Sequence, residues 1–255
     1  MSLKGFASLL SFLTIIPTKR HDIEEASRSF YLVPLIGLIT GTFTILPLTF
    51  INKLTLASIV ATLVTYVITG FIHLDGLADF IDALASGKKG ASAVKIMKEP
   101  WRGTYAIASV SLCILITYAS ILELHSSLLS ILISYIMIYE SMYILAALSP
   151  RPQHEGLGRI FINNAKKVHT VLKNIVTLVI TLVGTTTIFY LVTSSINVVT
   201  FLKLNLLLFT TSLATPLVTL KIARRVTGYT SGDVLGFNLE ICRSLTLLLM
   251  ALLIT

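Results

Sequence analysis

Seven apolar stretches, each about long enough to cross a bilayer, most constrain how this chain can fold. A helix needs about 20 predominantly apolar residues to span the hydrocarbon core, where every backbone polar group must find its partner within the protein. We therefore expect an all-α, polytopic integral membrane helix bundle. The expected spans are residues 30–51, 54–72, 103–122, 128–148, 171–193, 201–220 and 236–255.

The composition supports this fold class and excludes several others. Apolar residues make up 55% of the 255 residues and charged residues 13%, which is about half of the roughly 25% that soluble domains carry. This balance excludes a soluble enzyme and a disordered chain. The two cysteines, Cys113 and Cys242, lie in apolar stretches, which excludes a small secreted domain held by several disulfides.

Positive charge is divided unevenly between the two sides of the expected bundle. The net charge is +8, and all 20 Lys and Arg residues except Lys53 and Lys203 fall on one side of the spans. Because loops rich in Lys and Arg stay in the cytoplasm, we expect a multi-pass cell-membrane protein with a cytoplasmic N-terminus. The basic residues form no single stripe with interleaved aromatics, so we expect no nucleic acid partner.

The segment from Gly5 to Ile16 is apolar but only about 12 residues long, too short to cross a bilayer unaided. We interpret it as an interfacial or re-entrant helix that ends at Pro17. It is not a good signal peptide, because Lys19 and Arg20 follow directly and resist translocation. One membrane-embedded domain is expected to fill residues 1–255. Its functional cytoplasmic loops are expected at about residues 73–102, 149–170 and 221–235.

Three aspartates follow directly on the second expected span. At about 100° per residue along a helix, Asp75, Asp79 and Asp82 share one face within two turns. Like charges at this spacing repel, so a cation is expected to hold them together. Carboxylates converging from one helix suit Mg²⁺, which keeps positions for water and substrate phosphate. The alternative is a solvated helix end, in which Asp75 caps the helix.

A second acidic group lies at the mouth of the last span. Asp233 and Glu240 are seven residues apart and share one helical face, with Ser231 just before them. Capping of that helix by Ser231 or Asp233 is an equally good interpretation. Between the two acidic groups, Gly156 and Gly158 free the backbone to approach an anion, although a plain turn explains them as well.

Basic residues surround these acidic groups on the side predicted to be cytoplasmic. Each is explained simply by membrane orientation, and together they would attract a phosphorylated substrate. They are Lys98, Arg102, Arg151, Arg159, Lys221, Arg224 and Arg225, with Glu99 among them.

Two further polar residues stand out. Glu140 lies inside the fourth expected span, where a carboxylate is costly and is taken to be functional by default, so a partner from another helix is expected. His73 is a candidate metal ligand, but a single histidine at a helix entry is more often a hydrogen-bonded structural residue. The remaining histidines lie in separate loops and receive no role.

The acidic motifs resemble those of the cobalamin synthase family, the adenosylcobinamide-GDP ribazoletransferases. The resemblance rests on residues 73–82 (HLDGLADFID) and 231–240 (SGDVLGFNLE). Further similar blocks, in the family's order, are residues 12–17, 34–37, 96–99 and 155–158.

The chain also departs from the family pattern at a few positions. Glu99 stands where Asp is usual, Ser231 where Thr is usual, and Arg243 where an acid is common. The usual arginine close to Trp101 is shifted to Arg102. These changes affect candidate substrate contacts and leave the three aspartates intact.

The resemblance implies transfer of the cobinamide-phosphate part of adenosylcobinamide-GDP to α-ribazole or its 5′-phosphate, with release of GMP. It further implies Mg²⁺, or alternatively Mn²⁺, held by Asp75 and Asp79. We expect Asp82, which shares their helical face, to be a third ligand and also to take the proton of the attacking hydroxyl. Homo-oligomerisation stays open. The implied substrate-binding residues are Lys98, Glu99, Arg102, Gly156, Gly158, Ser231, Asp233 and Glu240.

Two other functions remain as alternatives. A CDP-alcohol phosphotransferase also uses aspartates at the membrane surface, but its motif has Arg where Asp79 stands here, and its later acids are missing. A secondary transporter would place its acids near the membrane midplane, whereas most acids here lie outside the expected spans. Both alternatives are therefore less favoured than the ribazoletransferase.

Overall fold

The computed structural model describes residues 3–150, 156–193 and 198–254. Within these ranges all regular secondary structure is helical, which confirms the predicted all-α fold class. Arg151, predicted to lie beside the acidic groups, and Glu155 are outside the described residues.

The helices differ greatly in length, from single turns to spans of more than 20 residues. They are α1 (Leu3–Leu13), α2 (Ile23–Arg28), the 3₁₀-helix η1 (Phe30–Leu32), α3 (Val33–Phe50), α4 (Leu54–Val67), α5 (Ile72–Ala85), α6 (Ala91–Met97), α7 (Thr104–Glu123), α8 (Leu128–Leu148), α9 (Leu157–Ala165), α10 (Val168–Thr193), α11 (Val198–Val226) and α12 (Gly232–Ile254).

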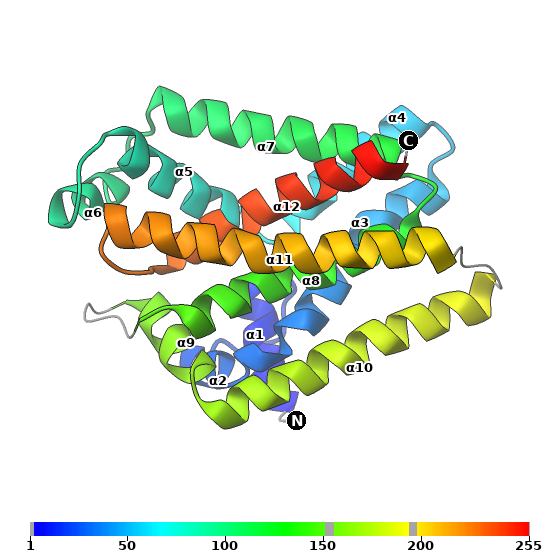
Figure 1. The fold of residues 1–255 in the computed structure, drawn as a ribbon, viewed down its shortest axis with the longest axis horizontal. Helices are drawn as coiled ribbons and strands as arrows, with labels where there is room; N and C mark the ends of the chain where they lie inside the picture. Colours follow the sequence, from blue (N-terminus) through cyan, green and yellow to red (C-terminus); the bar gives the residue numbers. More distant parts are fainter. Residues whose placement is uncertain (1–2, 151–155, 194–197, 255) are drawn as a thin grey trace.

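Six described helices are long and apolar enough to cross a membrane, namely α3 with η1, α7, α8, α10, α11 and α12. They match six of the seven expected spans, so the chain is a multi-pass membrane protein. Helices α7, α10, α11 and α12 extend lengthwise along the molecule (Figure 1). The two most buried are α8 and α12, and the most exposed is α10.

The remaining expected span, residues 54–72, is broken. Helix α4 has 14 residues, about 21 Å at 1.5 Å per residue, and α5 leaves it at an angle of 78°. The break occurs because Gly70 and Phe71 have φ values of +58° and +60°, and a left-handed residue cannot continue a right-handed helix. A seventh crossing is complete only if α4 and α5 are counted together.

The N-terminal segment is a short helix, as predicted, but it ends at Leu13 and not at Pro17. After it the chain turns toward the break between α4 and α5, where the Ile15 N–H donates a hydrogen bond to the Ile68 carbonyl (2.8 Å). Because the Ile15 N–H is used in this way, the helix cannot continue. Helix α1 therefore supports the broken span.

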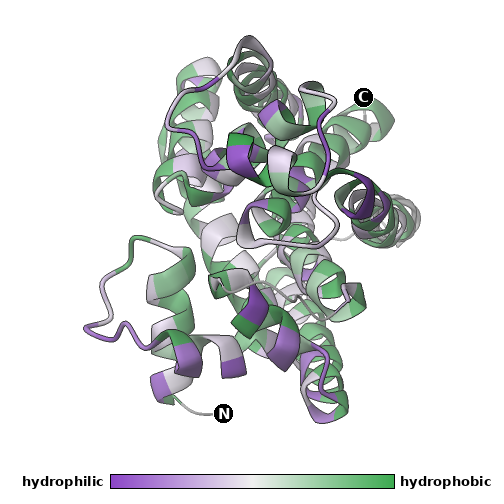
Figure 2. Ribbon diagram, turned by 90° about the vertical axis from the view of Figure 1, so that its left-hand side faces the viewer, coloured by the Kyte–Doolittle hydropathy of each residue, from purple (hydrophilic) through white to green (hydrophobic). Residues whose placement is uncertain are grey.

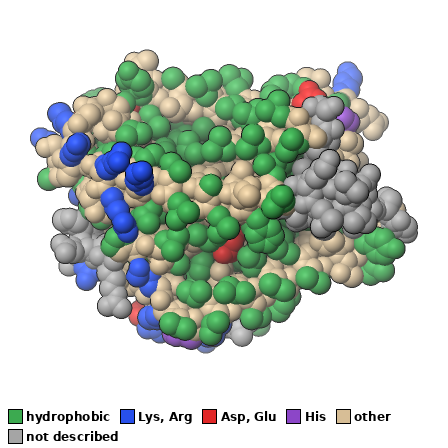
Figure 3. Space-filling model, in the orientation of Figure 1, with side chains coloured by type: hydrophobic (Ala, Val, Ile, Leu, Met, Phe, Trp, Pro, Cys, Tyr) green, Lys and Arg blue, Asp and Glu red, His purple; other side chains and the backbone are tan. Residues whose placement is uncertain are grey.

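The lipid bilayer is the natural environment of the helix surfaces. Helix α10 buries threonines and Asn174 against the bundle, whereas its exposed face is apolar, and Ile180 is 65% and Val192 79% exposed. Such a helix is stable only when apolar surroundings cover it. Figure 3 shows hydrophobic side chains over the middle of the molecule and most visible Lys and Arg at the left end. Figure 2, which looks onto that end, shows hydrophilic residues on the segments nearest the viewer.

Glu140, the predicted intramembrane acid, has a partner from another helix. The side-chain amide of Asn174 on α10 donates a hydrogen bond to Glu140 Oε2 (3.0 Å). Both residues are 3% exposed. The hydrogen bond ties α10 to the central helix α8.

The charge distribution predicts opposite labelling of two engineered cysteines. In Lys88→Cys the thiol should react with a membrane-impermeant maleimide only in inverted vesicles, and in His125→Cys only in intact cells, because loops rich in Lys and Arg stay inside. The native Cys113 and Cys242 are buried and should give no background. Labelling of both engineered positions from the same side would contradict the predicted topology.

Candidate active site

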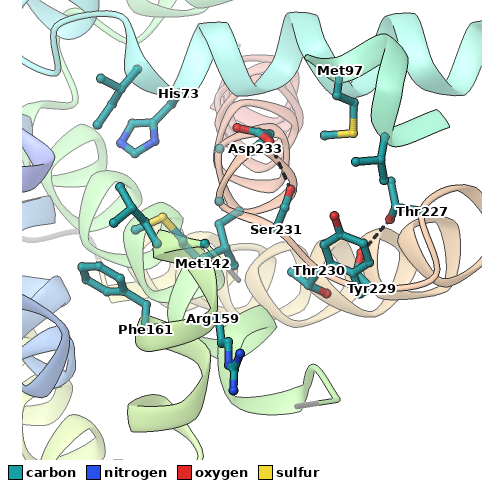
Figure 4. Close-up of a pocket in the computed structure, with 18 of the residues that line it drawn as sticks. His73, Met97, Met142, Arg159, Phe161, Thr227, Tyr229, Thr230, Ser231 and Asp233 are labelled. Atoms are coloured by element: carbon teal, nitrogen blue, oxygen red, sulfur yellow. Dashed lines mark hydrogen bonds between the residues drawn. The ribbon is translucent and has the colours of Figure 1, made fainter. Parts of the chain in front are cut away.

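A cavity of about 940 Å³ lies among the C-terminal end of α1, the start of α5, helices α6 and α9, and the turn before α12. Five of the predicted substrate-binding residues line it: Lys98, Gly156, Gly158, Ser231 and Asp233. Figure 4 shows Asp233 and Ser231 at the start of α12, between His73 on one side and Thr227 and Tyr229 on the other. The structure thus gathers residues from three distant parts of the sequence around one cavity.

Close backbone contacts hold the walls of this cavity together. A Cβ atom on Gly76 of α5 would lie 2.8 Å from the Asp233 carbonyl oxygen, and one on Gly158 of α9 would lie 2.6 Å from the Gly232 nitrogen. Only glycine allows the backbones to approach this closely. The start of α12 is therefore packed directly against α5 on one side and α9 on the other.

Asp75 and Asp79 share one cation beside this cavity. Arg102 Nη2 lies 2.9 Å from Asp75 Oδ1 and 2.7 Å from Asp79 Oδ1. The contact with Asp75 is a hydrogen bond, whereas the one with Asp79 is an ion pair without hydrogen-bond geometry. The hydrogen bond to Asp75 and the charge of Asp79 raise the pKa of Arg102 above its ordinary value. A cation therefore lies between the two carboxylates, and here it is the guanidinium of Arg102. The predicted metal ion stays a prediction.

Asp82 has a different environment from the other two aspartates. Its Oδ2 accepts a hydrogen bond from the Gly103 N–H (2.6 Å) and its Oδ1 one from the Ala106 N–H (3.1 Å). These N–H groups lie at the N-terminus of α7, where four donors lack partners within the helix. Asp82 thus caps α7 from a separate helix. Its predicted role as proton acceptor stays a prediction.

The fit of a metal ion depends on which carboxylates face each other. No group of three or more His, Cys, Asp or Glu side chains arranged to hold a metal ion occurs among the described residues. The structure therefore does not bring Asp82 together with Asp75 and Asp79 as a three-ligand site. Asp75 and Asp79 still form a pair of hard oxygen donors around one cation. Mg²⁺ is commonly bound by one or two carboxylates plus substrate phosphates, so the pair fits this ion.

At the start of α12, Ser231 has the capping role that the sequence left open. Ser231 Oγ accepts a hydrogen bond from the Val234 N–H and donates one to Asp233 Oδ2, both at 3.3 Å. The second contact holds the Asp233 carboxylate at the cavity wall. Ser231 therefore both starts the helix and orients the acid beside it.

Glu240 does not line the cavity, contrary to the predicted role in substrate binding. It is fully buried and accepts two hydrogen bonds from Arg243 Nη1, at 2.8 and 2.7 Å. Arg243 in turn lies over the rings of Tyr66 and Tyr135. The spacing of seven residues places Glu240 on the same face as Asp233 but about 10 Å further along the helix. Glu240 is therefore inside the bundle.

The other predicted contacts lie outside the cavity wall. Glu99 is exposed, and Arg102 contacts the aspartates of α5. Sequence reasoning gave no role to Phe161 and Met142, which do line the cavity. Their apolar character matches that of ordinary core residues, so nothing in the sequence distinguishes them. His73 also lines the cavity, and its position at the head of the aspartate motif was the available signal.

Comparison with known proteins identifies the family of the chain. The profile of the cobalamin-5-phosphate synthase family (CobS) matches residues 5–251. The chain belongs to this family. Synthases of this family are transferases of cobalamin biosynthesis, so the chain is an enzyme.

Curated relatives of this synthase cover nearly the whole chain. The adenosylcobinamide-GDP ribazoletransferase of Clostridium kluyveri is 29% identical over 260 aligned positions, covering 99% of this chain and 98% of the relative. That of Clostridium tetani is 28% identical and covers 96% and 94%. A Clostridium perfringens enzyme of the same name is 34% identical over 46% of this chain and 49% of its own. No solved structure matches this chain.

The contact between Gly76 and Asp233 predicts a large effect of one methyl group. Gly76→Ala should lower the free energy of unfolding by about 1–3 kcal/mol, the usual cost of overpacking, because the neighbouring atoms are backbone. Gly184→Ala on α10 is the matched control, since a Cβ there meets nothing within 4 Å. It should be neutral or slightly stabilising. Equal thermal stability of the two variants would contradict the close packing of α5 on α12.

Two variants separate the capping role of Asp82 from its predicted role as proton acceptor. Asp82→Ala should lower the free energy of unfolding by about 0.5–2 kcal/mol, as loss of a cap does, and Asp82→Asn should lose less because its amide oxygen still accepts a hydrogen bond. If Asp82 is also the proton acceptor, both variants should lose about 10²–10⁴ in turnover. Thermal unfolding and turnover are measured on the same samples. An unchanged stability of Asp82→Ala would exclude the cap.

Proposed function

We propose that this synthase transfers the cobinamide-phosphate part of adenosylcobinamide-GDP to α-ribazole or α-ribazole 5′-phosphate. The products are GMP and adenosylcobalamin or its 5′-phosphate. The names of the full-length relatives support these substrates. The observation that carries the proposal is the cavity of about 940 Å³ lined by Lys98, Arg159, Ser231 and Asp233, beside the cluster of Asp75, Asp79 and Arg102.

The reaction is a displacement at phosphorus. The ribose hydroxyl of the acceptor attacks the phosphorus that carries cobinamide, a new oxygen–phosphorus bond forms, and the bond to the leaving GMP breaks. Catalysis of such a transfer consists mainly of positioning and of stabilising charge on the phosphoryl oxygens. It requires no nucleophilic serine or cysteine.

Different residues of the site would bind the phosphate oxygens and the metal ion. Lys98 and Arg159 are exposed residues of the cavity wall and are suited to hold phosphate oxygens. Asp75 and Asp79 would hold Mg²⁺, which would neutralise charge on the pyrophosphate when bound. Arg102, which contacts both carboxylates, would then be free to contact phosphate itself.

Asp233 is the better-placed candidate for the proton acceptor. It lines the cavity, whereas both oxygens of Asp82 accept hydrogen bonds from the N-terminus of α7. A general base must reach the proton that it removes, in a plausible position of the substrate. We therefore assign proton transfer to Asp233 and the positioning of α7 to Asp82.

The proposed location follows from the same charge distribution as the topology. We place the chain in the cell membrane, with the N-terminus, the cavity and the Asp75–Asp79–Arg102 cluster on the cytoplasmic side. Water-soluble nucleotides would reach the cavity directly from that side.

The proposed reaction predicts metal-dependent formation of GMP. Purified enzyme with adenosylcobinamide-GDP, α-ribazole 5′-phosphate and Mg²⁺ should release GMP, and EDTA should stop the release. Mg²⁺ at a hundredfold excess over its dissociation constant should also stabilise the fold by about 2.7 kcal/mol. Asp79→Asn should lose both effects.

The control is Glu24→Gln, a variant of an exposed residue outside the cavity wall, whose ion pair with Arg28 is on the surface. It should keep both effects. Metal stabilisation that survives in Asp79→Asn would place the ion elsewhere. Absence of GMP with the wild-type enzyme would overturn the proposed reaction.

A further inference from the structure

His73 lies on the cavity wall with unused hydrogen-bonding capacity. Its side chain is 5% exposed, and its Nε2 has no hydrogen-bond partner among the described residues. The ring packs edge-on against Tyr139, with centroids 6.0 Å apart. A buried polar atom without a partner destabilises a protein. Because Nε2 itself has almost no accessible surface, the ring must turn toward the cavity for this nitrogen to gain a partner on a ligand.

The part of the cavity around His73 is apolar and aromatic. We call Leu13, Phe30, Met142 and Phe161 the apolar end of the cavity; Figure 4 shows His73, Met142 and Phe161 together on one side of it. The rings of Phe30 and Phe161 form an edge-to-face pair with centroids 5.2 Å apart. Aromatic walls of this kind favour flat, apolar ring systems.

On the basis of the proposed function, we propose that the apolar end binds the aromatic base of the ribazole acceptor. His73 then donates a hydrogen bond to the ring nitrogen of the base that carries no ribose. A neutral imidazole has one N–H donor, and this nitrogen of a benzimidazole is an acceptor. The ribose and phosphate extend toward Asp233 and Lys98.

The number of polar groups distinguishes this base from the guanine of the other substrate. A ribosylated benzimidazole has one ring nitrogen to satisfy, whereas guanine has a carbonyl, a ring N–H, an amino group and two further ring nitrogens. Each buried polar group left without a partner weakens binding by roughly tenfold or more. One imidazole among apolar side chains satisfies the first base and not the second.

The size of the cavity fits an acceptor of this kind. Sites for drug-sized ligands usually measure roughly 300–1,000 Å³, and this one is about 940 Å³. A nucleoside phosphate fits within that volume. The corrinoid substrate is several times larger than a nucleotide and must extend beyond it.

The test replaces the ring nitrogen in the ligand and the imidazole in the protein. The probes are α-ribazole 5′-phosphate and its indole analogue, in which CH replaces the free ring nitrogen. Their dissociation constants are measured by calorimetry with wild-type enzyme and His73→Phe. The wild type should bind the ribazole about tenfold more tightly than the analogue, and His73→Phe should bind both with similar affinity.

Tyr139→Phe is the matched control, because it removes the neighbouring hydroxyl outside the cavity wall. It should keep the tenfold preference, and GMP should bind His73→Phe as tightly as it binds the wild type. Should His73→Phe keep the preference for ribazole, or lose affinity for GMP instead, the assignment of the base to this end is wrong.

Turnover of the wild type is recorded in the same experiment. If the wild type forms GMP and His73→Phe still prefers ribazole to the analogue, this inference is refuted and the proposed function is not. A wild type that binds neither acceptor and forms no GMP would refute the proposed function as well. If His73→Phe does not fold, His73→Asn, which keeps a donor of smaller size, is compared in its place and should retain part of the preference.

Discussion

The break between α4 and α5 is the constraint on which the site depends. Two consecutive residues with positive φ, Gly70 and Phe71, end α4 before it has crossed a bilayer. Helix α5 then packs on α12, with Gly76 against the Asp233 backbone. A straight continuation of α4 would carry Asp75 and Asp79 away from α12. The break therefore places the aspartates and the cavity side by side.

Buried polar pairs fix the helices around this break. Arg243 and Glu240 are both fully buried on α12, and Arg243 lies over the rings of Tyr66 on α4 and Tyr135 on α8. Removing one partner of a buried ion pair usually costs about 3–5 kcal/mol, because the other charge stays in a medium of low dielectric. A rotation of α12 would break these contacts. The ion pair thus holds the register of α12 against α4 and α8.

Hydropathy predicted six of the spans and the short N-terminal helix because each is a local property of the sequence. It missed the break, since residues 54–72 are apolar throughout and only the backbone at Gly70 and Phe71 interrupts them. Helical periodicity placed Glu240 on the same face of α12 as Asp233, but it carried no information on how far along the helix Glu240 lies from the cavity. The role of Asp82 depends on α7, a helix 21 residues later in the sequence, which no local pattern could predict.

Helix α5 connects the two parts of the site. His73 in its first turn faces the cavity, whereas Asp75 and Asp79 contact Arg102 outside it. Between these positions, Gly76 lies against Asp233, which itself lines the cavity. A bound base at His73 and a bound cation at Asp75 and Asp79 therefore act on the same two turns of helix. Because protein interiors are closely packed, the position of one ligand constrains the position of the other.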